Sequence, residues 1–249
     1  MATSPIEQFN VDKYIELEVA GIDVSFTISS MWMVLVTLAL TIFFLGGTRK
    51  SQLVPSRWQL VVEMSYTFIA NMVKDNVGRE GKSYFPFVFT LFFFILGLNL
   101  AGMIPYSFTV TSHIAFNLAI ALFVFLGVTV IGFAKHGFGY LKLFLPDGVP
   151  AAMVPLIVPI EIISYFIRPV SLSVRLFANM MAGHIMMKVF AGFVISMSAA
   201  GVFGAVAAVA PFAINVMLTG LEILIAFLQA YVFAILTCIY LNDAMHPSH

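Results

Sequence analysis

The stretch SLSVRLFANMMAGHIMMKVF (171–190) decides the fold class of this chain, because the cation Arg175 lies inside a largely apolar run. The guanidinium of Arg175 stays protonated at any physiological pH. At the centre of a membrane-spanning helix such a charge costs about 3 kcal/mol on insertion scales. The nearest carboxylates in the sequence, Glu161 and Glu222, are far along the chain. We therefore interpret Arg175 as a functional charge that faces an acidic site on another subunit.

The composition around this stretch is that of a membrane protein. Of the 249 residues, 61% are hydrophobic and only 10% are charged, with a mean hydropathy of +1.02. Soluble domains carry about 25% charged residues. The net charge is zero, which gives no reason to expect a nucleic-acid partner. The one cysteine, Cys238, cannot form an internal disulfide and lacks the spacing of a metal site, so we expect neither a metal nor a cofactor.

Five apolar segments are long enough to cross a bilayer, which requires about 20 residues. We predict an all-α polytopic membrane protein that forms a single membrane domain over residues 1–249. Its parts are an acidic tail, a first span, a two-helix hairpin and a long tilted helix pair, at 1–28, 29–45, 85–134 and 151–241 respectively. As one straight helix, the run from 151 to 200 would reach about 75 Å, against a hydrocarbon core of about 30 Å. It must therefore tilt, bend or break, and its prolines permit bends.

Residues 57–79 differ from the spans. Apolar side chains such as Val62, Ile69 and Val73 fall on one arc of a helix, and Glu63 and Lys74 fall on the opposite arc. This pattern is typical of an amphipathic helix that lies along a membrane surface. A helix in a soluble loop is the alternative.

Lysine and arginine in the short loops indicate the orientation, because such loops are enriched in these residues on the cytoplasmic side. The segment 46–84 contains six of them, and the segment 135–149 contains Lys135 and Lys142. The first 28 residues carry five carboxylates against one lysine. We therefore expect the N-terminus outside and the C-terminus inside, as five crossings require.

The polar residues of the first helix of the pair fall on two sides. Glu161, Arg168 and Arg175 are spaced by seven residues and share one side, and Asn179 stays close to it. His184 follows Arg175 by nine residues, which turns it to the opposite side. The helix thus has two polar flanks. A structural ion pair between Glu161 and Arg168 is the alternative to a functional role for these two residues.

The last helix carries a single polar stripe, because Asn215, Glu222 and Gln229 are seven residues apart. A carboxylate at mid-span is either buried with a partner or titrates. His184 is the natural partner, since its reference pKa of about 6.5 suits a proton carrier. The two side chains predict a proton relay between adjacent helices. The alternative is a static buried pair that fixes the helix register.

At this point the residues match a known family. SLSVRLFANMMAGHI (171–185) and GLEILIAFLQAYVFAILTCIYL (220–241) resemble subunit a of F-type ATP synthase, and LNLAGMIPYSFTVTSHIAFNLAIAL (98–122) resembles its mitochondrial and alphaproteobacterial branch. The resemblance covers most of the chain from about residue 30. It implies a stator subunit that conducts protons in the membrane sector of the ATP synthase holoenzyme. Such a subunit contributes to ATP synthesis but does not itself bind nucleotide. The implied partners are the rotating c-ring, the peripheral-stalk b subunits, the lipid bilayer and the transported protons.

The resemblance also implies roles for individual residues. Arg175 would be the essential charge that faces the c-ring carboxylates. The outer proton half-channel would contain His184, Glu222, Asn179, Gln229, Asn215 and Asn99, and the inner half-channel Glu161 and Arg168. Some bacterial members carry the acid on the first helix and the histidine on the second. Here the two are exchanged, which leaves open whether His184 or Glu222 receives the proton first.

Three other classes of membrane protein fit these residues less well. A secondary transporter would show an inverted repeat, and the two halves of the chain have no convincing similarity. A haem protein would need paired histidines inside its spans, and only His184 lies deep. A purely structural subunit leaves Arg175 and the polar stripe of the last helix unexplained. We expect the protein in a bacterial inner membrane rather than in the mitochondrial inner membrane.

Overall fold

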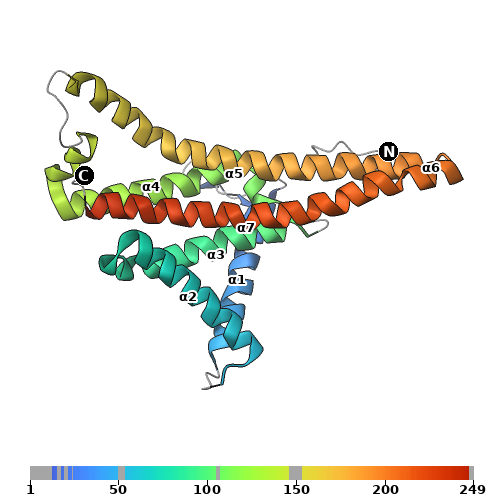
Figure 1. Ribbon diagram of the computed structural model, residues 1–249, viewed down its shortest axis with the longest axis horizontal. Helices are drawn as coiled ribbons and strands as arrows, with labels where there is room; N and C mark the ends of the chain where they lie inside the picture. The colour runs from blue at the N-terminus through green and yellow to red at the C-terminus, as the bar shows by residue number, and fades with distance from the viewer. Residues whose placement is uncertain are drawn as a thin grey trace. The chain divides into compact units, whose positions relative to one another are not determined.

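The computed structural model describes most of the chain, and five long apolar helices dominate it (Figure 1). The described residues are 13–15, 18–19, 22–23, 25–49, 54–104, 107–145 and 153–246. The long helices are α1 (Ile28–Thr48), α3 (Phe85–Gly102), α4 (Ile114–His136), α5 (Val154–Ser198) and α7 (Val209–Met245). All five are long and apolar enough to cross a membrane. The predicted all-α polytopic membrane fold is therefore confirmed.

Helix α5 contains most of the apolar run from 151 to 200, for which the sequence allowed a tilt, a bend or a break. It is a single helix of 45 residues that contains Pro159 and Pro169 without interruption (Figure 1). A proline inside a helix removes one backbone hydrogen bond and bends the helix axis. Pro155 lies in the first turn, where the missing N–H has no intrahelical partner to lose. The run is thus bent rather than broken.

The segment predicted as an amphipathic helix forms α2 (Arg57–Val77). Its N-terminus is capped by Ser56, whose side chain accepts a hydrogen bond from the backbone N–H of Gln59 at 3.3 Å. It ends two residues earlier than predicted, because Gly78 adopts a φ of 78°, a conformation that favours glycine. The buried face includes Val62, Ile69 and Val73. A short 3-10 helix, η2 (Arg79–Tyr84), then leads into α3.

Two 3-10 helices lie in the described parts of the connections between the remaining helices. Between α3 and α4 lies the 3-10 turn η3 (Val110–Ser112), and after α4 comes η4 (Gly137–Phe144). The small-residue run 198–208 joins α5 to α7. Most of it is helical, because α6 (Val202–Ala207) follows a turn of three residues that ends at Gly201, where φ is 87°.

The acidic N-terminal segment contains short strands that the sequence analysis did not predict. Strand β1 (Lys13–Ile15) pairs antiparallel with β4 (Phe26–Thr27), and β2 (Glu18–Val19) pairs antiparallel with β3 (Ile22–Asp23). Strands of two or three residues are too short to show an alternating pattern, which needs at least four residues. The sequence therefore carried no readable signal for them.

The chain divides into two compact units, and each unit collects the ends of several helices. The first unit comprises Met1–Leu40, Phe94–Ile114 and Leu176–Gln229. The second unit comprises Thr41–Phe93, Ala115–Arg175 and Ala230–His249. The first unit contains the connections from α3 to α4 and from α5 to α6, and the second contains η2 and η4. Helices α1, α3, α5 and α7 contribute residues to both, as expected of a chain that crosses a layer repeatedly.

Each unit has its own apolar core. In the first unit, Ile95, Leu98, Met180 and Ala226 are at most 1% exposed. In the second unit the fully buried side chains are larger and include aromatic rings, among them Phe92, Tyr140 and Phe233. Each buried aromatic ring of this kind removes roughly 150–250 Å² of surface from solvent, which stabilises the packing of the helices.

Candidate functional site

A buried carboxylate marks the polar centre of the first unit. Glu222 on α7 is 3% exposed, and neither carboxylate oxygen has a hydrogen-bond partner among the described residues. Its carboxyl group lies against the backbone of α5 at Gly183. A Cβ added to Gly183 would lie 2.7 Å from the Glu222 carboxyl carbon, closer than real Cβ contacts allow. The glycine therefore makes the space that the carboxylate occupies.

His184, the next residue on α5, is also buried and is held by a loop residue. Its Nε2 lies 3.1 Å from Oγ1 of Thr109, which precedes η3. The same hydroxyl lies 3.4 Å from the carbonyl oxygen of Gly102, to which it donates. A hydroxyl has one proton and two lone pairs, so Thr109 can donate to Gly102 while it accepts from an Nε2–H of His184. This contact fixes the ring on its flank of α5.

The predicted pair of His184 and Glu222 is not joined directly. No hydrogen bond or ion pair links the two side chains in the part of the chain that the structure describes. They are nevertheless neighbours through Gly183, which touches Glu222 and precedes His184 in the chain. A static His184–Glu222 ion pair, which the sequence left as an alternative, is thus absent from these described residues.

Two asparagines add further polar atoms to the first unit. Asn99 on α3 is fully buried, and its Nδ2 donates to the carbonyl oxygen of Ala226 on α7 at 3.2 Å. Ala226 lies one turn after Glu222, so this bond fastens α3 to α7 beside the acid. The Oδ1 atoms of Asn99 and Asn215 have no hydrogen-bond partner among the described residues. Buried polar atoms in proteins are usually bonded to protein or to ordered water, so these oxygens are suited to holding water.

The two remaining residues predicted for the outer path lie on the same helices. Asn179 is half-buried on α5, one turn after Arg175, and Gln229 is buried on α7. The whole predicted outer set, on α3, α5 and α7, belongs to the first unit.

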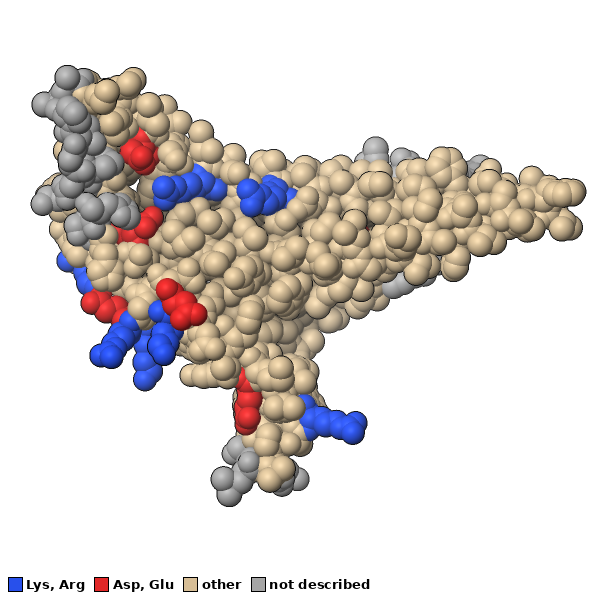
Figure 2. Space-filling view, viewed as in Figure 1, with Lys and Arg blue, Asp and Glu red and all other residues tan. Residues whose placement is uncertain are grey.

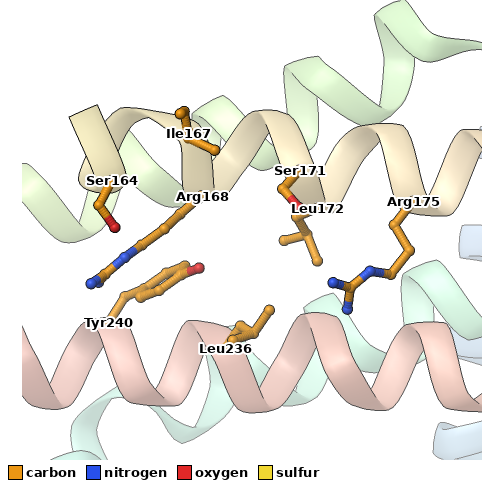
Figure 3. A pocket seen from close by; sticks show the side chains of 8 residues that line it. All are labelled: Ser164, Ile167, Arg168, Ser171, Leu172, Arg175, Leu236 and Tyr240. Atoms are coloured by element: carbon orange, nitrogen blue, oxygen red, sulfur yellow. The ribbon is translucent and has the colours of Figure 1, made fainter. Parts of the chain in front are cut away.

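Arg175 and Arg168 line one cavity in the second unit, between α5 and α7 (Figure 3). The cavity has a volume of about 230 Å³. The guanidinium of Arg168 extends past Tyr240, and that of Arg175 points toward α7 from the other end of the cavity (Figure 3). Arg175 is exposed on the surface of this chain and forms no ion pair with a described residue. The remaining lining comes from Ser164, Ile167, Ser171, Leu172 and Leu236.

Arg168 is held by a partner that the sequence analysis missed. Its Nη1 lies 3.5 Å from Oδ2 of Asp243 near the end of α7. The guanidinium carbon also lies 6.0 Å and 5.5 Å from the ring centroids of Tyr165 and Tyr240, within the range of cation–π attraction. The predicted alternative of a Glu161–Arg168 ion pair is wrong, since Arg168 pairs with Asp243 and Glu161, half-buried on α5, pairs with no described residue.

A series of hydrogen-bonded hydroxyl groups joins α5 to η4 and α4 close to Arg168 in the sequence. The Tyr140 hydroxyl lies 2.9 Å from that of Tyr165, which in turn lies 2.7 Å from Oγ1 of Thr129. The hydroxyl group of Thr129 donates to the carbonyl oxygen of Phe125 at 2.7 Å, so this series of hydrogen bonds ends on the backbone of α4. The Tyr140 ring packs on Gly132, where a Cβ would lie 2.7 Å from a ring carbon. These contacts fix η4 and α4 against the part of α5 that carries Arg168.

The residues that sequence reasoning missed differ in the signal they offered. Asp243 was visible as a carboxylate at the end of an apolar helix. Gly183 was visible as a glycine inside a helix, where it costs about 1 kcal/mol relative to alanine and therefore requires a reason. Thr109 offered no signal, since its partner is 75 residues away.

Comparison with known proteins agrees with the resemblance found in the sequence. Residues 29–242 match the family model of the ATP synthase A chain. The proteins called ATP synthase subunit a from Chelativorans sp. (strain BNC1) and Pelagibacter ubique (strain HTCC1062) are 59% and 58% identical to this chain, with all of each chain covered. The protein of that name from Rhizobium meliloti (strain 1021) is 57% identical, with 99% of each chain covered.

Proposed function

Because the chain belongs to the ATP synthase A chain family, we propose that it is the stator subunit through which protons pass to and from a rotating ring of carboxylates. Two water-filled half-channels reach the middle of the membrane and do not meet. The proposed partners are the c-ring and the peripheral-stalk b subunits. The chain itself breaks no bond in a substrate, and nucleotide chemistry belongs to other subunits of the holoenzyme.

The outer half-channel passes through the polar centre of the first unit. His184 and Glu222 exchange protons by way of the space beside Gly183. The Oδ1 atoms of Asn99 and Asn215, which have no partner in the part of the chain that the structure describes, orient water there. Asn179 and Gln229 extend the path toward the ring. The Glu222 carboxylate is buried and has no hydrogen-bond partner within the described ranges, which supports this role, because a purely structural acid would be expected to have one.

The inner half-channel begins at the cavity in the second unit. Ser171 and Tyr240 offer hydroxyl groups along its wall, and Glu161 offers a carboxylate on the preceding turns of α5. The Arg168–Asp243 pair supports this use of the cavity, because it neutralises one of the two guanidiniums that line it. Protons released from the ring leave by this route.

Arg175 separates the two paths. A ring carboxylate that meets the guanidinium loses its proton more readily, because an opposite charge favours the ionised form. The same fixed charge repels protons and closes a direct leak. Once protonated on the outer side, the neutral acid can turn through lipid, which an ionised carboxylate could not do at an acceptable cost. Each proton that crosses 100 mV supplies about 2.3 kcal/mol, and the ring sums these steps into rotation.

The single observation that carries this proposal is the exposed guanidinium of Arg175 in an apolar helix, which pairs with no residue that the structure describes. An unpaired cation on a lipid-facing side would be costly, whereas one that faces a ring of acids is compensated. We further propose a bacterial inner membrane, with the N-terminus outside and the C-terminus inside, from the distribution of lysine and arginine.

The experiment compares proton flux in vesicles that contain the whole ATP synthase with Arg175→Ala or with Lys188→Ala. Lys188 is the matched control, since it is another exposed cation on α5 and lies outside the cavity. We expect Arg175→Ala to abolish ATP-driven pumping and to permit passive leak, and Lys188→Ala to retain pumping. Normal pumping in the assembled Arg175→Ala complex would refute the proposal.

A further inference from the structure

A second cavity, remote from the proposed proton path, lies in the second unit where α2 ends and α3 begins. Its volume is about 410 Å³, within the range of about 300–1,000 Å³ typical of small-molecule pockets. The chain reverses direction here, because Gly78 ends α2 and η2 returns toward the apolar helix. This reversal brings the last turn of α2 and the first turn of η2 to the same cavity, together with Phe85 at the start of α3.

The floor of this cavity is apolar. The rings of Tyr66 and Phe85 contact each other with centroids 4.6 Å apart, and Val73 is 2% exposed. Ala70 also lines the cavity, and its small side chain leaves the hollow open. The floor is therefore shaped for a hydrocarbon group rather than for a hydrated ion.

The rim of the cavity carries three exposed cations, Lys74, Arg79 and Lys82. None of the three side chains forms an ion pair or hydrogen bond with a described residue, whereas the side chain of nearby Lys135 pairs with Glu80. Figure 2 shows a group of basic side chains gathered on one part of the surface. Three cations at one rim repel one another, so an anion bound between them would relieve the repulsion.

We propose that this cavity binds an anionic phospholipid, with the phosphate at Lys74, Arg79 and Lys82 and an acyl chain against Tyr66 and Phe85. Basic pockets beside membrane helices are suited to such headgroups, and each basic residue contributes about 1 kcal/mol near a charged membrane surface. Free phosphate would leave the apolar floor exposed to water. The apolar helix that begins at Phe85 places acyl chains beside the floor.

The test uses the complete ATP synthase in phosphatidylcholine vesicles that contain a trace of phosphatidylglycerol with a photoreactive diazirine on its acyl chain. Phosphatidylcholine with the same diazirine is the reference lipid. After illumination, mass spectrometry measures the labelling of the peptide that contains Tyr66 to Phe85. We expect phosphatidylglycerol to label this peptide more strongly than phosphatidylcholine in the unaltered complex, and excess inorganic phosphate to leave the labelling unchanged.

Two variants and one control locate the effect. Arg79→Gln with Lys82→Gln should reduce the preference for phosphatidylglycerol by about fivefold for each cation removed, the equivalent of about 1 kcal/mol each. The control, Arg49→Gln with Arg57→Gln, removes two exposed cations outside the cavity and should leave the preference intact. Ala70→Phe fills the hollow without a change of charge and should reduce labelling by both lipids.

Three results would overturn the proposal. The first is equal labelling by the two lipids in the unaltered complex, a comparison that requires no variant. The second is an equal loss of preference in the control. The third is crosslinking of a photoreactive residue at position 70 to a peripheral-stalk chain instead of lipid, which would assign the cavity to a protein partner.

Discussion

The carboxyl group of Glu222 on α7 occupies a space that exists only because residue 183 of α5 is a glycine. A Cβ at this position would lie 2.7 Å from the carboxyl carbon and 2.9 Å from the Cγ of Glu222. The acid is 3% exposed and has no hydrogen-bond partner among the described residues. Its position is therefore set by the shape of the facing helix rather than by a polar partner.

Replacement of Gly183 by alanine should displace this carboxylate. Overpacking of a close contact costs about 1–3 kcal/mol, so we expect ATP-driven proton pumping to fall about tenfold in Gly183→Ala. Pumping per assembled complex, measured in vesicles, checks this. Gly192→Ala is the control on the same helix, because a Cβ there meets nothing within 4 Å. Combination of Gly183→Ala with Glu222→Asp shortens the acid and should restore part of the flux. Unimpaired pumping in Gly183→Ala would show that the position of the acid is immaterial.

Loss of the Thr109 hydroxyl should impair His184 without a change in size. Thr109→Val removes the 3.1 Å contact to Nε2 and leaves a buried ring nitrogen unpaired, which costs about 1–3 kcal/mol. We expect proton flux to fall at least about fivefold and its pH profile to shift, while Thr109→Ser retains both. Stopped-flow measurement of pH-jump-driven flux tests this. Identical profiles for the valine and serine variants would mean that the hydroxyl does not position the histidine.

The ion pair of Arg168 and Asp243 should contribute little to stability. The Arg168 side chain is 34% exposed, and the closest approach is 3.5 Å, so solvent screens much of the attraction. A double-mutant cycle with Arg168→Gln and Asp243→Asn should give a coupling energy of about 1 kcal/mol or less in the free energy of unfolding. Asp243→Asn should nevertheless slow proton release, because it leaves two uncompensated guanidiniums at one cavity. An unchanged flux in this variant would separate the pair from the inner path.

His113 gives the loop before α4 a dependence on pH. Its ring stacks on Phe108 with centroids 5.1 Å apart, and burial lowers the pKa of His113 from its ordinary value of 6.5. The folded loop thus prefers the neutral ring. The stabilisation is complete above the ordinary value and is lost as the pH falls through the lowered pKa. We expect the Tm of the unaltered protein to fall more steeply under acid than that of His113→Gln. Equal slopes would contradict this.

The helices were predictable and most of their partners were not. Length and hydropathy identify the five long helices because most side chains that face lipid or a packed core are apolar. The spacing of seven between Arg168 and Arg175 predicts a shared side of α5, and both residues line one cavity. The partner of Arg168, by contrast, is 75 residues away, and helical periodicity carries no information on which helices become neighbours.

The same limit applies to the candidate site. His184 and Glu222 could be predicted as site residues because they are polar residues in apolar runs. The Thr109 contact and the close fit at Gly183 could not be predicted, because both depend on residues outside the helix that carries the polar group. The direct pairing of acid and histidine was inferred from their chemistry alone. In the structure, His184 contacts the hydroxyl group of Thr109 in a loop, and the carboxyl group of Glu222 packs against Gly183.

The tight turn at Gly201 has a mechanical consequence. Only three residues separate α5 from α6, and the positive φ at Gly201 is a conformation that favours glycine. We therefore expect a displacement of α5 along its axis to be transmitted through α6 to the start of α7. This coupling favours a constant axial register between His184 on α5 and Glu222 on α7.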